Sequence, residues 1–149
     1  KGLIYQDGNK KRAVTVNKIR SKSNYVPLVG NVSAGQGILA IENIEGEIPI
    51  PQDIFTGSDL FMLRVEGNSM INAGISNGDL VIVHSQNSAE IGEIVVVFWQ
   101  ERATVKRLRD ISPNIILHPE NEEMTDIIIP YEENPIILGK VVGCIKKFL

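Results

Sequence analysis

The chain has 149 residues, 43% of them hydrophobic and 22% charged, which is the length and balance of one ordinary soluble domain with a single core. It holds no run of eighteen or more apolar residues and no signal-peptide core, so a membrane protein and a secreted protein are excluded and a cytoplasmic one is expected. The net charge of −3 divides into about +6 over residues 1–22 and −9 over the remainder, which suits a segment near nucleic acid joined to a domain that does not bind it. On charge alone, a solvated basic arm explains the first part equally simply.

Residues 1–17 predict a small β-hairpin, because two short β-prone runs flank the turn-forming Asp7-Gly8-Asn9. Residues 18–24 are polar and without apolar periodicity, which predicts a linker. The main domain is then expected to occupy residues 25–149.

The main domain is a series of short β-branched runs separated by Gly, Pro, Asn and Asp. This spacing predicts a mostly β fold, a compact antiparallel sheet or partly open barrel with helix confined to short turns. The expected strands are Leu60 to Val65, Leu80 to His84, Ile94 to Trp99, Ala103 to Leu108, Ile115 to His118, Ile127 to Ile129 and Ile136 to Phe148. The first of these alternates as a strand with one face in the core does, whereas Ile94 to Phe98 is apolar on both faces and predicts a central strand.

Ser69 follows the first of these strands directly, in Glu66-Gly67-Asn68-Ser69-Met70. A serine at a strand-to-turn junction can present its hydroxyl and nearby backbone N–H groups outward, as a nucleophile with its own oxyanion donors requires. A helix-capping serine is the commoner explanation of such a residue.

Lys106 is the better candidate base for Ser69. His84 ends a strand, and His118 precedes Pro119 in a segment without a suitable acid partner pattern, so a Ser-His-Asp triad is not indicated. Lys106 shares a strand face with Thr104 and Leu108, and burial on an apolar face favours the neutral amine. The alternative is a lysine whose ammonium reaches water beside Arg107 and Arg109.

Four motifs in one order resemble the LexA repressors, with their relatives among phage repressors and UmuD proteins, a family of self-cleaving Ser-Lys peptidases. The motifs are Val32-Ser33-Ala34-Gly35, Arg64 to Met70, Gly78 to Val83 and Thr104 to Leu108. The resemblance extends through Leu117-His118-Pro119-Glu120-Asn121 to Gly139–Lys146, with 35 residues from Ala34 to Ser69 and 37 from Ser69 to Lys106.

The resemblance implies an autocatalytic serine endopeptidase in which Ser69 is the nucleophile, Lys106 the general base and Ala34-Gly35 the scissile bond. The backbone N–H groups of Asn68 and Ser69 would form the oxyanion hole, and Val32 and Ser33 would occupy the subsites before the cut. It implies no cofactor and no metal. Cys144 is the only cysteine, so no internal disulfide is expected either.

The resemblance also implies partners. The chain would form a homodimer, for which the apolar segment Val141 to Phe148 could pair edge to edge with its copy. A RecA filament on single-stranded DNA would favour cleavage, which ends repression of DNA-damage (SOS) genes by separating the dimer from its operator-binding heads. The hairpin over residues 1–17 resembles the wing that ends a winged helix-turn-helix, and the rest of that head is absent, so a truncated chain is expected.

Three alternatives stay open at this point. A phage-type repressor or a UmuD-like protein would use the same autoproteolysis, although UmuD cuts are typically Cys-Gly. A signal peptidase also combines a Ser-Met motif with a downstream lysine, but its membrane anchor is missing. A catalytically inert dimerisation module would have the same fold, with Ser69 and Lys106 taking no part in any reaction.

Overall fold

The computed structural model describes residues 23–32 and 43–148. Its strands are β1 (Ser23–Val29), β2 (Ile44–Pro51), β3 (Leu60–Arg64), β4 (Leu80–Ser85), β5 (Ile94–Trp99), β6 (Arg102–Asp110), β7 (Ile115–His118), β8 (Ile127–Ile129) and β9 (Ile136–Ile145), with short 3₁₀ turns η2 (Ile71–Ala73) and η3 (Tyr131–Glu133). The predicted hairpin over residues 1–17 and the residues Ser33, Ala34 and Gly35 lie outside the described part.

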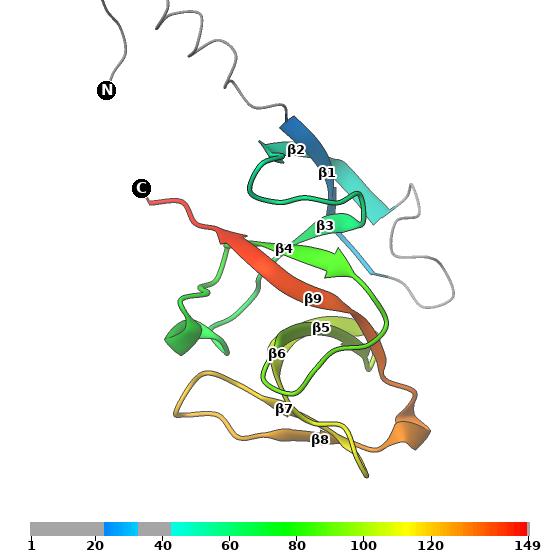
Figure 1. Cartoon of the computed structure of the whole chain (residues 1–149). Coiled ribbons are helices and arrows are strands. Elements are labelled where there is room, and N and C mark those ends of the chain that lie inside the picture. Colours follow the sequence, from blue (N-terminus) through cyan, green and yellow to red (C-terminus); the bar gives the residue numbers. More distant parts are fainter. Residues whose placement is uncertain (1–22, 33–42, 149) are drawn as a thin grey trace, which may run out of the picture.

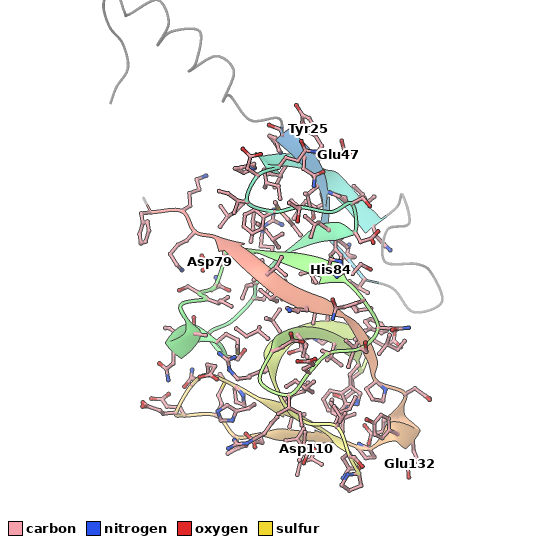
Figure 2. The ribbon with its side chains drawn as sticks, viewed as in Figure 1. Tyr25, Glu47, Asp79, His84, Asp110 and Glu132 are labelled. Carbon is pink, nitrogen blue, oxygen red and sulfur yellow. The ribbon has the colours of Figure 1, made fainter. Side chains whose placement is uncertain are left out.

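In the described part, the strands form one open sheet in the order β2-β1-β3-β4-β9-β5-β6-β7-β8 (Figure 1). The predicted mostly β fold with short helical turns is confirmed. The pairing of β1 with β3 is parallel, and every other neighbouring pair in the order is antiparallel, so the sheet is mixed. Tyr25 and Glu47 lie at one end of the molecule, and Asp110 and Glu132 at the other (Figure 2).

Strand β9 joins the two halves of the sheet. It pairs with β4 from Gly139 to Ile145 and with β5 from Ile136 to Lys140. Because β3 and β4 lie on one side of it and β5 and β6 on the other, the strand pairing between these two hairpins runs through β9.

Strand β5 is a central strand, as its sequence predicts. Val95 and Val97 pack into one apolar cluster, with Leu108 and Leu117, whereas Val96 packs into another. The side chains from Val95 to Phe98 are buried, so both faces of the strand lie in the core.

The expectation that β3 buries only one face is wrong. Phe61 and Leu63 lie in the cluster that also contains Val96, but Leu60 and Met62 are also buried, in a further cluster with Val26 and Ile82. Strands β1 and β2 extend the sheet beyond β3, and their side chains, among them Val26 and Ile50, join the cluster on this second face.

Strands β1 and β2 were not among the predicted strands. β1 pairs along its length with β2, and its first residues, Ser23 and Asn24, belong to the segment predicted as a linker. The other residues of that segment lie outside the described part. Proline in β1, together with proline, glycine and glutamate in β2, hides the strand pattern, since these residues are poor strand formers.

No helix in residues 23–32 and 43–148 is long and apolar enough to cross a membrane. Within the same ranges, no three His, Cys, Asp or Glu side chains come together as metal ligands.

Candidate active site

Ser69 lies in the turn that connects β3 with β4, here called the nucleophile turn (residues 65–79). Two backbone hydrogen bonds close the turn, from Val65 N–H to the Asp79 carbonyl and from Gly78 N–H to the Val65 carbonyl, both 2.8 Å long. Gly67 has a φ of +84°, a conformation that favours glycine, and Met70, next to Ser69, is buried. The turn is therefore fixed on both sides of a half-buried Ser69.

Lys146, which directly follows β9, anchors the last part of the nucleophile turn. Asp79 is buried and accepts hydrogen bonds from Lys146 Nζ and from the Ser76 N–H at 2.8 Å. These bonds, that of Lys146 first, lower the pKa of the Asp79 carboxyl. Figure 2 shows Asp79 beside the C-terminal half of β9.

Lys106 lies on β6, opposite Val95 of β5. Its side chain donates a 2.6 Å hydrogen bond to Thr104 Oγ1, as their predicted common strand face requires. Only 9% of the residue is exposed, which rules out the alternative of a lysine that extends into water.

The surroundings of Lys106 favour its neutral form. Burial lowers the pKa of the amine, and the positive charge of Arg102 lowers it further. The other two arginines of the strand form ion pairs, Arg107 with Glu120 and Arg109 with Asp126. A buried lysine with a lowered pKa can accept a proton that an ordinary lysine at neutral pH cannot.

Ser69 and Lys106 line the same cleft, which has a volume of about 610 Å³. Asn68 lines it too, as do Gly30, Asn31 and Val32, which lie directly before the predicted cleavage site. The described contacts include no hydrogen bond between Ser69 and Lys106, whose amine is bonded to Thr104. A nucleophile and its base often form their hydrogen bond only when the substrate is bound. Their position in one cleft is therefore compatible with a nucleophile and base pair, although no described hydrogen bond joins them.

The statement that His118 lacks an acid partner is wrong. His118 Nδ1 lies 2.6 Å from Asp126 Oδ1, and Arg109 contacts both residues. Neither His118 nor His84 is among the described residues that line the cleft with Ser69. The pair therefore does not supply a base for this serine.

The family model described as Peptidase S24-like matches residues 27–142, which include the whole nucleophile turn and Lys106. The chain belongs to this family. It is 47% identical over 148 residues to a LexA repressor of Desulfitobacterium hafniense, covering 96% of this chain and 71% of that protein. It is 47% identical to a LexA repressor of Clostridium botulinum and 46% identical to one of Caldicellulosiruptor saccharolyticus, with 99% of this chain and 73% of each relative covered. The resemblance to the LexA repressors is thus confirmed.

Of the predicted site residues, the cleft brings together Ser69, Lys106, Asn68 and Val32. Ser33, Ala34 and Gly35 lie outside the described residues. Sequence reasoning missed Asn121, whose side-chain amide donates a hydrogen bond to the carbonyl of Asn68. The only sequence signal for this residue was its place in Leu117 to Asn121, a segment that shares in the family resemblance.

Proposed function

We propose that this chain is the self-cleaving, dimerising part of a LexA-type repressor and that it cuts its own Ala34-Gly35 bond with a Ser69/Lys106 dyad. The observation that carries the proposal is the cleft that Ser69 shares with Lys106, a buried amine with a lowered pKa. Membership of a peptidase family and 47% identity to LexA repressors support it.

In the proposed reaction, neutral Lys106 Nζ takes the proton from Ser69 Oγ, and Oγ bonds to the carbonyl carbon of Ala34. The N–H groups of Asn68 and Ser69 stabilise the oxyanion of the tetrahedral intermediate. The Ala34–Gly35 C–N bond then breaks as the Gly35 nitrogen takes the proton from Lys106. Water, deprotonated by Lys106, finally hydrolyses the ester between Ala34 and Ser69.

The substrate of this reaction is a tethered loop. Residues 31–42, which contain the proposed cleavage site, connect β1 with β2 in the sequence, and the Gly30 N–H donates a 2.7 Å hydrogen bond to the Asn43 carbonyl. Val32, with Ser33 the proposed subsite residue before the cut, already packs against the core. Tethering makes the attack intramolecular, an advantage of up to about 7–11 kcal/mol, so a dyad without a third member is sufficient.

The proposed biology is that of a DNA-damage repressor in the cytoplasm. Residues 1–17 would be the wing of an operator-binding head and residues 18–22 part of the connection to the body. A RecA filament on single-stranded DNA would bind the cleavable state of the loop more tightly than the withdrawn state, since only differential affinity shifts such an equilibrium. Cleavage would then separate two linked heads and end SOS repression.

The proposed homodimer uses the free edge of β9. From Val141 to Ile145 this strand pairs on one edge with β4, while its pairing with β5 stops at Lys140. Val142, Ile145 and Phe148 are exposed. Antiparallel pairing of two such edges would cover them. Sedimentation is expected to show a dimer at micromolar concentration, and a monomer at high micromolar concentration would contradict this.

The proposed cleavage is tested by incubating the purified chain at pH values from 7 to 10.5 and following its intact mass. We expect fragments that end at Ala34 and begin at Gly35, at a rate independent of protein concentration. Below the pKa of Lys106, the rate should rise about tenfold for each pH unit, because the neutral fraction of the amine rises tenfold. It should level off below the ordinary lysine pKa of about 10.4, because burial lowers the pKa of Lys106.

The opposite result is equally informative. If the chain stays intact at every pH, also with RecA, nucleotide and single-stranded DNA added, the chain is an inert dimerisation module. Cleavage whose first-order rate constant rises with protein concentration would show that one molecule cuts another, against the tethered mechanism.

A further inference from the structure

The loop between β7 and β8, here called the clamp loop (residues 119–126), is bonded to the nucleophile turn on both sides of Ser69. Asn121 Nδ2 donates to the Asn68 carbonyl at 2.9 Å, across 53 residues of sequence. The Asn72 N–H donates to the Glu120 carbonyl at 2.8 Å. The first of these bonds reaches the peptide group directly before the serine.

This peptide group has a special position. The Asn68 carbonyl and the Ser69 N–H belong to the same planar unit, which is trans, since the cis peptide among the described residues is Ser112-Pro113. In a trans peptide the C=O and N–H point in opposite directions, so fixing one fixes the other. The Ser69 N–H donates to no residue of the described part, and it is a proposed oxyanion donor.

We infer that the Asn121 amide is a positioning residue for the oxyanion hole, which it orients by holding the Asn68 carbonyl. The inference rests on the proposed self-cleavage and adds a residue that does not touch the substrate. The same bond polarises the peptide and strengthens the Ser69 N–H as a donor. Within the described residues, the Asn68 carbonyl otherwise accepts only a long 3.4 Å bond, from the Ile71 N–H, so Asn121 is its main partner there.

The clamp loop holds Asn121 in a defined orientation. Its Oδ1 accepts a 2.9 Å hydrogen bond from the Glu123 N–H, which leaves Nδ2 to face Asn68. Glu120 accepts a 2.7 Å charge-assisted bond from Arg107, the neighbour of Lys106 on β6. The clamp loop is therefore fixed to the strand of the proposed base and can hold the nucleophile turn against it.

The test removes the amide donor of Asn121 by substitution and keeps the side-chain oxygen that supports the conformation of the clamp loop. Asn121→Asp retains the oxygen that accepts from Glu123 and loses the N–H that reaches Asn68. Asn121→Ser keeps a turn-forming oxygen on a shorter, uncharged side chain. Thr125→Asp is the matched control, since it adds the same charge to an exposed position of the same loop.

Two rates are measured for each variant, with melting temperature as the check on folding. The first is self-cleavage at the high-pH plateau, where protonation of Lys106 no longer limits it. The second is the reaction of Ser69 with diisopropyl fluorophosphate, in which Oγ displaces fluoride from phosphorus. Lys106 takes the Ser69 proton, and the attack passes through a five-coordinate phosphorus whose phosphoryl oxygen is held by the same N–H groups. The reaction does not depend on docking of the loop.

We expect both Asn121 variants to lower both rates about 10- to 100-fold, with Thr125→Asp close to wild type. Slower cleavage with an unchanged fluorophosphate rate would show that Asn121 acts on loop docking and would overturn the inference. Equal losses in Thr125→Asp and Asn121→Asp, or no loss in either Asn121 variant, would overturn it as well. Wild-type protein that neither cleaves nor reacts would instead refute the proposed function.

Discussion

Alanine in place of Ser69 or of Lys106 is expected to reduce self-cleavage at least about a thousandfold, because nucleophile and base act as a unit and the loss of either removes most of the catalysis. The Ser69 variant should be inactive at every pH. The Lys106 variant should also lose the dependence on the ionisation of a buried amine. Intact mass over hours at pH 7 and pH 10 measures both effects.

Matched controls separate this loss from a general effect of substitution. Ser58→Ala and Lys147→Ala remove the same groups from exposed positions outside the cleft and should leave the rate unchanged. Lys106→Met keeps the buried volume, so it tests the base without leaving a cavity beside Thr104. A Lys106→Met protein that folds and still cleaves within tenfold of wild type would assign the proton transfer to another group.

The strands that could be predicted from the sequence are those with an uninterrupted apolar run or a regular period-two alternation of side chains. Strand β5 is apolar on both faces and is central, and β6 places Thr104 and Lys106 on one face, because a period of two follows from strand geometry alone. Strands β1 and β2 escaped prediction because Pro27 and Pro49 are atypical for strands. The second buried face of β3 then escaped too, since these two strands cover it.

The candidate site divides in the same way. Ser69 and Lys106 could be proposed because four motifs in one order resemble those of a known peptidase family, whereas their local patterns alone left a capping serine and a water-exposed lysine open. Asn121 could not, because its contact with Asn68 joins two loops 53 residues apart and exists only once the sheet has formed. For the same reason, the pairing of His118 with Asp126 depends on the antiparallel register of β7 and β8 and shows no sequence signature.

Gly139→Ala is expected to be among the most damaging single-methyl additions, because Gly139 lies where β9 pairs with β4 and β5 at once. A Cβ there would lie 2.3 Å from the His84 carbonyl oxygen and 2.6 Å from Val83 Cγ1. A backbone atom cannot turn away as a side chain can, so β4 and β9 must separate locally. We expect the free energy of unfolding, measured in urea, to fall by at least about 2–3 kcal/mol.

Gly46→Ala is the matched control, because a Cβ at this exposed position of β2 would have no atom within 4 Å. It should be neutral or raise the free energy of unfolding by up to about 1 kcal/mol, since alanine restricts the unfolded chain. Equal stability of the two variants would refute the steric argument.

Ser69 follows β3 and Lys106 lies on β6, on opposite sides of β9, so a shift at Gly139 should also slow self-cleavage where the variant stays folded. If Gly139→Ala is destabilised but cleaves at the wild-type rate while folded, β9 stabilises the sheet without setting the distance between Ser69 and Lys106, the two proposed catalytic groups.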